Sequence, residues 1–583
     1  MTGDRVDYAS SQEAAGRFPE IPPEATTESV ILIGTDGVAM SGAEAVLEAL
    51  AAAPRWGWAR ALYRRMPGVA PLTESAYRLV ARRRRFFSRA TRTLWGASVE
   101  VPAYRLSRCL FLRLVGAIYL VAFLSLWVQV DGLLGSDGIL PASSYLHDAL
   151  ERLGPRAYRV LPTLCWLDSS DATLGLMCAA GAALSVLMIL GVLPSVCAAS
   201  MWILYLSLTV AGQTFLSFQW DILLLEAGFL SIFLSPLRWR CRMGCPSPPS
   251  RMSVALIQWL LFRLMFSSGL TKLTWGDPTW WNLSALDFHY QTQPLPTWTA
   301  WWAHQAPGWL DRASVLVMFA IELGAPFGLL APRRVRHAAA AALLAFQAAI
   351  AATGNYGFFN LISAALVLFM LDDTAYPRRW RARLGGPGVA ARRRWPRLLL
   401  APLAALLFLV GAVHLIAAFR FSPTYPRPVR ALLEWTAPLH LSNGYGLFRV
   451  MTTTRLEIVV EGSRDGAEWL PYEFRWKPGD PRRAPAFVQP HMPRLDWQMW
   501  FAALSDFRST PWFQRFVLKL LEGSPSVLSL LERNPFPDSP PRYIRAVAYE
   551  YHFTGLAEQR EQGAWWLRDG RRDYAPTLSL KAR

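Results

Sequence analysis

Nine apolar runs recur between residues 110 and 419 of this 583-residue chain, and most are long enough to cross a bilayer as a helix. A spanning helix needs about 20 apolar residues, because the hydrocarbon core holds no water to satisfy exposed backbone groups. The runs therefore predict a polytopic α-helical membrane domain at residues 105–420. Its expected spans are residues 110–130, 173–192, 196–212, 214–234, 253–271, 313–331, 337–353, 358–371 and 398–419.

Arginine in the connecting loops predicts how these spans are oriented. Arginine clusters precede the first span and occupy the loops at residues 235–252, 332–337 and 372–397. Positively charged loops stay on the inner side of a membrane. All four clusters lie inside if the nine spans alternate, which places the N-terminus inside and the C-terminus outside. The net charge of +18 is then explained by contact with anionic membrane lipids, and no nucleic acid partner is expected.

Two further segments flank the membrane domain. Residues 1–30 are polar and aperiodic, which predicts a disordered tail, and residues 31–95 predict a short strand followed by helices on the inner side. Residues 421–583 combine alternating strands with helices and predict an outer α+β domain. Hairpins are expected to turn at residues 463–466 and at Asp569-Gly570. The predicted fold is thus a polytopic α-helical membrane protein with a C-terminal α+β extramembrane domain.

The apolar run from Thr214 to Pro236 carries two carboxylates, Asp221 and Glu226. An ionised carboxylate at the centre of a bilayer costs about 2.5–3.5 kcal/mol, so each must be paired or functional. The predicted topology puts Asp221 near the outer boundary, within reach of water or of Lys272. Glu226 lies deeper and is expected to pair with a cation such as Arg263.

Other polar residues are also expected inside spans. The intramembrane set is Asp221, Glu226, Gln258, Arg263, Glu322, Gln347 and His414. Glu322 is a second possible partner for Arg263. The set is interpreted either as buried pairs that fix the helix register or as a proton path or ligand site.

The outer loop from Lys272 to Trp309 mixes polar side chains with seven tryptophans. Tryptophan is common where a membrane meets water, so a membrane belt is expected for the group. The histidines and aspartates could ligate a metal, but their spacing is not specific, and neither a metal nor another cofactor is expected. The candidate site residues of this loop are Asp277, Trp280, Asp287, His289, Gln293 and His304.

Several long motifs resemble the lipase maturation factor family. They include FLSFQWDILLLEAGFL, GNYGFFNLISAALVLFMLDD, PRLDWQMWFAAL and NPFPDSPPRYIRAVAYEYHFT, and the resemblance covers residues 106–554. It implies a membrane-bound maturation or assembly factor for exported proteins, because family members in animals help secreted dimeric lipases to fold in the endoplasmic reticulum membrane. The alanine- and arginine-rich composition suggests a bacterial chain, for which the inner membrane takes that place.

The same resemblance implies that the outer domain engages a lipase-like, exported client protein. The helix expected over residues 496–504 then offers Asp496, Trp497 and Trp500 as candidate client contacts. Nothing in the sequence specifies an oligomeric state.

The segment from Ile31 to Arg89 resembles the C-terminal part of the thioredoxin-like DCC family. Members of that family carry a D-x-x-C-x-x-C motif near their first strand. No cysteine precedes Cys109 in this chain, so the segment is interpreted as a degenerate cytoplasmic appendage without redox activity.

The segment SSGLTKLTWGDPTWW is similar to the Gly-x-x-Lys-Leu segment in the membrane domain of vitamin K-dependent γ-carboxylases. This resemblance implies that Lys272 is a catalytic base in quinone chemistry, near Asp277, Asp287 and His289. The competing interpretation is a lysine that anchors the end of its span at the interface. An enzyme is therefore the alternative to a maturation factor. A transporter ranks last, since no inverted repeats are evident.

Overall fold

The computed structural model describes residues 29–53, 56–96, 101–241, 248–384, 395–419 and 424–580, with residue 99 and a few positions before residue 26. The chain forms two compact units. One comprises residues 1–100 with 332–334, and the other comprises residues 101–331 with 335–583. Most of the tail expected at residues 1–30 lies outside the described residues.

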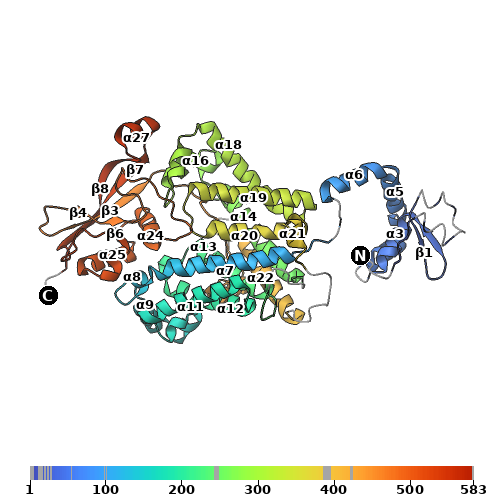
Figure 1. Ribbon diagram of the computed structural model, residues 1–583, viewed down its shortest axis with the longest axis horizontal. Helices are drawn as coiled ribbons and strands as arrows, with labels where there is room; N and C mark the ends of the chain where they lie inside the picture. Colours follow the sequence, from blue (N-terminus) through green and yellow to red (C-terminus); the bar gives the residue numbers. More distant parts are fainter. Residues whose placement is uncertain are drawn as a thin grey trace. The chain divides into compact units, whose positions relative to one another are not determined.

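The first unit is a short hairpin followed by helices (Figure 1), where the sequence predicted a single short strand before the helices. Strands β1 and β2 pair antiparallel, and the chain reverses between them at Asp36-Gly37, where Gly37 has a positive φ of 79°. The elements are β1 (Ile31–Ile33), β2 (Ala39–Ser41), α3 (Gly42–Ala51), α4 (Gly57–Arg65), α5 (Val69–Arg82) and α6 (Arg84–Trp95).

The second unit contains the membrane helices. Among the described residues, seven helices are long and apolar enough to cross a membrane, which confirms the predicted helical membrane class. They are α7 (Arg105–Trp127), α11 (Asp171–Leu190), α12 (Pro194–Ala211), α14 (Arg251–Thr274), α18 with η5 and η6 (Gly308–Leu330), α19 (Arg333–Thr353) and α22 (Arg397–Ala417). The other two expected spans are shorter helices, α13 (Gln219–Leu234) and α20 (Phe359–Val367), which continues into η7 (Leu368–Met370).

Helix α13 occupies the centre of the helical bundle. Its 16 residues extend about 24 Å, less than the roughly 30 Å of a hydrocarbon core, so other helices must cover its ends. It packs against α7, α12, α14 and α20, and twelve of its residues are buried. Gly228 permits the close approach of α7, because a Cβ there would lie 2.0 Å from the Tyr119 hydroxyl. That hydroxyl donates to the Leu224 carbonyl at 3.1 Å.

The C-terminal part of the chain forms the predicted α+β domain. Its central sheet has the order β4-β3-β7-β8 and is antiparallel throughout. The strands are β3 (Leu456–Ser463), β4 (Leu470–Pro471), β5 (Glu473–Phe474), β6 (Leu531–Arg533), β7 (Tyr543–Phe553) and β8 (Trp566–Leu578); the helices are α24 (Arg494–Ala503), α25 (Pro511–Glu522), α26 (Pro525–Leu528) and α27 (Leu556–Gln562).

One of the two predicted hairpins is present. Strands β3 and β4 pair across the turn at residues 463–466, where the Ser463 hydroxyl accepts from the Gly466 amide at 2.8 Å. The hairpin expected at Asp569-Gly570 is wrong. The chain continues through that position as one long strand, β8, because β7 offers an eleven-residue edge for it to pair with, and the irregular register is absorbed by bulges.

The connecting segments separate to the two ends of the helical bundle. The arginine-rich α21 (Arg378–Arg381) lies at the end opposite the C-terminal domain, whereas α8 (Val130–Leu134), α9 (Ala142–Leu153) and α16 (Ala285–Thr292) lie at the end that carries it (Figure 1). Asp137 pairs there with Lys519 of α25 at 3.0 Å. This arrangement agrees with the alternation predicted from loop charge. The remaining helices are η2 (Gly154–Arg156), α10 (Ala157–Val160), η3 (Leu164–Trp166), η4 (Gln213–Leu216), α15 (Pro278–Trp281), α17 (Trp298–His304), η8 (Asp373–Ala375), α23 (Arg427–Thr436) and η9 (Ala437–Leu439).

Candidate functional site

Asp221 of α13 joins the helical bundle to the C-terminal domain through a buried ion pair with Arg494 of α24. We call this contact between the bundle and the domain the junction. Arg494, the first residue of α24, donates to both carboxylate oxygens of Asp221, at 2.5 and 2.8 Å. The Tyr205 hydroxyl donates to the same carboxylate at 2.5 Å, and all three side chains are buried. The prediction that Asp221 reaches water or Lys272 is therefore wrong. A carboxylate this enclosed is stable only with a partner as close as this bidentate guanidinium.

The predicted pair of Glu226 and Arg263 is present, and it holds a segment that the sequence did not reveal as part of the bundle. The Asn443 amide and the Tyr445 hydroxyl donate to Glu226, at 2.9 and 2.8 Å, while Arg263 donates to the Asn443 carbonyl at 2.8 Å. Arg263 is central in α14, so the non-helical residues 440–447 enter the bundle at membrane depth. We call them the re-entrant segment. Such backbone is tolerated there only when protein groups satisfy it, as here.

His414 lies beside the re-entrant segment. A Cβ at Gly444 would lie 3.6 Å from the His414 Nδ1 atom, so the ring of α22 packs against that backbone. His414 therefore contributes to the packing of this segment, which accounts for its place in the predicted intramembrane polar set.

Glu322 pairs with Lys272, and not with Arg263. The Lys272 amine donates to both oxygens of Glu322, at 2.7 and 3.0 Å, and both side chains are buried. Glu322 lies on η5 (Ala320–Gly324), a single π-helical turn that follows the end of α18. The Trp280 ring lies 5.4 Å from the amine. The charge of Lys272 is thus balanced by the charge of Glu322 inside the protein.

Two of the candidate residues in the outer loop fasten that loop to the C-terminal domain. Asp277 caps α15 by accepting from the Thr279 amide at 2.8 Å, and its other oxygen accepts from the Met451 amide. The Trp280 indole donates to the Phe448 carbonyl at 3.0 Å. Of the seven tryptophans, Trp280 and Trp301 are buried, Trp275 is half-buried, and Trp281, Trp298, Trp302 and Trp309 are exposed, so the last four remain candidates for the predicted membrane belt.

His289 and Gln293 meet at a residue that the sequence analysis did not select. The Tyr356 hydroxyl lies 3.0 Å from His289 Nε2 and donates to Gln293 Oε1 at 2.8 Å. His304 packs instead against the Phe553 ring, with 5.6 Å between ring centroids. Burial lowers the pKa of His304, and the Asp287 carboxylate opposes that shift. Among the described residues, the side chains within mutual metal-ligand distance are Glu550, His552 and Asp569, none of them in this loop.

We predict that His289 makes stability depend on pH. Burial, with the nearby charge of Lys272, lowers the pKa of His289 to about 4 from 6.5. The unfolded chain thus takes up this proton first, and the stability is lost as the pH falls from about 6.5 to about 4. We expect His289→Gln to remove on the order of 2–3 kcal/mol of this dependence, measured by thermal unfolding at several pH values. His491, whose pKa burial also lowers to about 4, is unchanged in this variant. The part of the pH dependence that His491 contributes should therefore remain.

Arg455 is a second buried arginine that the sequence analysis treated only as part of a strand. It donates to the Gln291 and Pro294 carbonyls, at 2.8 and 3.0 Å, and pairs with Glu457. Glu457 also pairs with Lys477 at 2.8 Å. The outer loop and the sheet are thus held together by backbone carbonyls that match a planar guanidinium.

Of the three candidate client contacts on α24, Asp496 is enclosed within the C-terminal domain, whereas Trp497 and Trp500 contact the membrane domain. Asp496 accepts from the Trp476 and Lys477 amides, at 2.8 and 2.9 Å, and is buried. The buried Trp497 packs on Trp220 of α13, with 4.6 Å between ring centroids. The half-buried Trp500 donates to the Thr292 carbonyl at 2.8 Å. The prediction is corrected on this point, because Asp496 and Trp497 have no free surface to offer a client.

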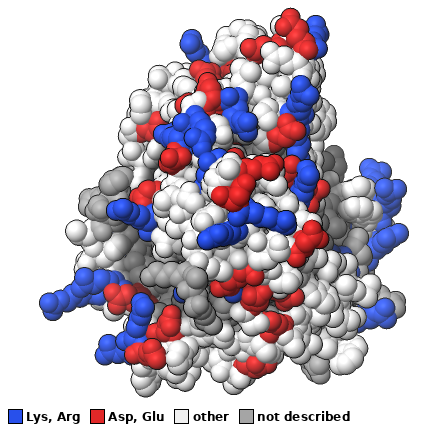
Figure 2. Space-filling model, turned by 90° about the vertical axis from the view of Figure 1, so that its left-hand side faces the viewer, with Lys and Arg blue, Asp and Glu red and all other residues white. Residues whose placement is uncertain are grey.

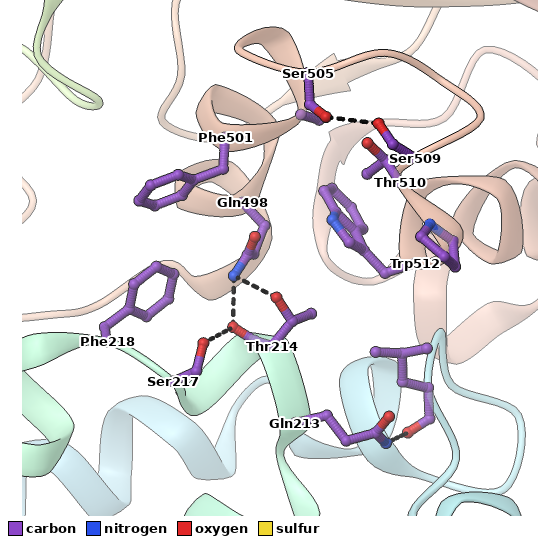
Figure 3. Close-up of a pocket in the computed structure, with 13 residues that line it drawn as sticks. Gln213, Thr214, Ser217, Phe218, Gln498, Phe501, Ser505, Ser509, Thr510 and Trp512 are labelled. Carbon is purple, nitrogen blue, oxygen red and sulfur yellow. Dashed lines mark hydrogen bonds between the residues drawn. The ribbon is translucent and has the colours of Figure 1, made fainter. Parts of the chain in front are cut away.

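A cavity of about 630 Å³ opens beside this junction (Figure 3). It lies between η4, the start of α13, and the helices α24 and α25. Phe218 and Phe501 stand on one side and Trp512 on the other, and the Gln498 amide donates to the Thr214 carbonyl at 2.5 Å. None of the lining residues is charged, and seven carry a hydroxyl or amide group. The lining residues are Leu140, Gln213, Thr214, Ser217, Phe218, Gln498, Phe501, Ala502, Ser505, Ser509, Thr510, Pro511 and Trp512.

The fold and this junction define a class: a polytopic membrane protein whose extramembrane domain is locked to its helices by buried ion pairs. The chain belongs to the lipase maturation factor family. The transmembrane domain of that family matches residues 106–378, and its C-terminal domain matches residues 441–576. The predicted resemblance is thereby confirmed, and the chain is an integral membrane protein.

Lipase maturation factors 1 and 2 from animals match most of the chain. Human lipase maturation factor 2 is 36% identical over 598 residues, which cover 82% of this chain and 83% of the relative. Lipase maturation factor 1 of Bos taurus is 33% identical over 512 residues, which cover 83% of this chain and 91% of the relative. Residues 2–90 match a DCC1-like thiol-disulfide oxidoreductase, a wider range than the predicted one. No solved structure matches the chain.

Proposed function

We propose that this membrane-bound maturation factor binds partly folded exported proteins at the junction cavity, on the outer side of its membrane, and that a lipase-like protein is among its clients. The names of the relatives support the client class. The observation that carries the site is the uncharged cavity between the bundle and the C-terminal domain.

The chemistry of the cavity suits an unfinished polypeptide. Such a chain exposes backbone amide and carbonyl groups together with apolar side chains that the native fold would bury. The hydroxyl and amide groups of the lining can satisfy the former, while Phe218, Phe501 and Trp512 offer apolar contact. Because no charge lines the cavity, it has no means of rejecting segments by their charge, as a factor that serves folding intermediates requires.

The rest of the outer surface supports a protein partner over nucleic acid. Lysine and arginine alternate with aspartate and glutamate across the end of the molecule that carries the C-terminal domain, without an extended basic patch on that face (Figure 2). The five cysteines that the structure describes are buried.

The cavity can be tested by filling it. Ser505 is exposed at its rim, and its hydroxyl lies 2.8 Å from that of Ser509. We expect Ser505→Trp to lower the yield of active client about tenfold, because the indole occupies the space of a client side chain. The measurement is the specific activity of a co-expressed, exported lipase in cells that lack the native gene. Ser505→Ala loses only the hydroxyl and is expected to behave as wild type.

Two results would contradict this proposal at different levels. A Ser505→Trp protein that folds normally and still matures the client would remove the cavity from the proposal. Deleting the gene without changing the activity of any exported enzyme would remove the client function itself. Capture of the client by the full chain in mild detergent, lost in Ser505→Trp alone, would support both.

The alternative of a membrane enzyme makes a distinct prediction for Lys272. We expect Lys272→Met to lower the free energy of unfolding by about 3 kcal/mol, since Glu322 is left buried without its cation. Lys272→Met/Glu322→Leu removes both charges and is expected to restore stability and client maturation. Thermal unfolding and the lipase assay check this outcome. A stable but inactive double variant would favour Lys272 as a base.

A further inference from the structure

Helix α6 (Arg84–Trp95) has two opposed faces, and none of its residues is buried. At about 100° per residue, most of its apolar side chains share one face and its arginines share the other, while Trp95 at its end falls on the side of the arginines. The apolar face is formed by Phe86, Phe87, Ala90 and Leu94, and the basic face by Arg84, Arg85, Arg89 and Arg92. Phe86 is 64% exposed, whereas Phe87, Ala90 and Leu94 are half-buried, so the rest of this unit covers the apolar face only in part.

The charge around α6 has one sign. Six arginines fall between Arg82 and Arg92, and no acidic residue occurs between Glu74 and Glu100. The surface therefore lacks local counter-charges and attracts anionic groups. The preceding helix α5 extends the exposed apolar surface, since Leu72 and Leu79 are 71% and 53% exposed.

The length of chain after α6 keeps it close to a bilayer. Trp95 ends this helix and Arg105 begins the first spanning helix, α7, so nine residues connect them. Even fully extended, such a linker reaches only about 30 Å. A helix tethered at this distance samples the membrane surface at high effective concentration.

We propose that α6 lies on the inner leaflet and binds anionic phospholipid headgroups. The arginine side chains contact the phosphates, while the face of Phe86, Phe87 and Leu94 enters the boundary between headgroups and acyl chains. A purely electrostatic partner such as nucleic acid would engage the basic face and leave the apolar face exposed to water. A lipid surface satisfies both faces at once. This inference is independent of the client function.

The test measures the depth of two positions on α6 in the full-length protein. A Cys245→Ser background carries a single added cysteine, either Leu94→Cys on the apolar face or Ser88→Cys on the polar face, labelled with an environment-sensitive fluorophore. Each protein is reconstituted into nanodiscs of phosphatidylcholine, with or without 30 mol% phosphatidylglycerol, about a third of the lipid in the anionic discs. A spin-labelled lipid then reports contact by quenching.

We expect strong quenching at position 94 and weak quenching at position 88, only in the anionic discs. Each Arg→Gln change on the basic face should lower the ratio of bound to released helix about fivefold, since one arginine near an anionic surface contributes about 1 kcal/mol. Quenching that is equal at the two positions, or that ignores the anionic lipid, would overturn the proposal. Thermal unfolding of the same variants shows whether the fold is retained.

Discussion

Arg494→Ala is expected to lower the free energy of unfolding by about 3–5 kcal/mol. The substitution leaves the Asp221 carboxylate buried with only the Tyr205 hydroxyl as a partner, and it also removes the contact with the Phe215 carbonyl at 3.1 Å. Because this pair joins α13 to α24, the C-terminal domain should become cleavable by protease at lower temperature than the helices unfold. Thermal unfolding and limited proteolysis of the full chain in detergent measure both effects.

Two further variants make this prediction specific. Asp221→Leu/Arg494→Met removes both charges and is expected to recover most of the loss, because replacing a buried pair by apolar side chains is often neutral. Arg515→Ala, at an exposed position on α25, is the matched control and should stay within about 0.5 kcal/mol of wild type. A loss in the double variant as large as in Arg494→Ala would show that charge pairing does not hold the junction.

Glu226→Leu should also lower the free energy of unfolding by about 3–5 kcal/mol, in this case at the contact with the re-entrant segment. Arg263 loses its counter-charge, and the Asn443 amide and Tyr445 hydroxyl lose their acceptor. These groups then lie unsatisfied in a region without water, so the re-entrant segment should leave the bundle. Trypsin cleavage at Arg449, compared between variant and wild type, reports that release.

Glu226→Gln is the conservative comparison. Its amide oxygen can still accept from Asn443 and Tyr445, but the charge that answers Arg263 is gone. We expect an intermediate loss of stability and little release of the re-entrant segment. If Glu226→Gln were as damaging as Glu226→Leu, the charge alone would account for the effect, and the hydrogen bonds to the re-entrant segment would be irrelevant.

The ion pairs show how far reasoning from the sequence reaches. Glu226 and Arg263 were matched correctly, because each lies near the centre of its own apolar run. The partner of Asp221 was missed because it lies 273 residues later, in a segment that reads as an ordinary outer helix. The re-entrant segment was missed for a related reason. Its polarity is typical of an extramembrane loop, and only the carboxylate and guanidinium that receive it make its burial possible.

The outer domain shows the same limit. The alternation of Arg455–Glu461 predicted a strand correctly, yet it did not reveal that Arg455 is buried and holds the outer loop. The helix with Trp497 and Trp500 was located correctly, and its aromatic face was assigned to a client when it belongs to the junction. Amphipathic pattern shows that a face is covered, but it does not show what covers it.

The sequence by itself determined the membrane class, the positions of the apolar helices and the family, because apolar run length and long motifs are properties of the chain read locally. Only the tertiary structure decided which charges meet, which tryptophans are buried and where a cavity remains. The physical reason is the cost of a charge in low dielectric. Asp221, Glu226 and Glu322 each pair with one cation among 60 lysines and arginines, and that choice depends on the packing of segments up to 273 residues apart.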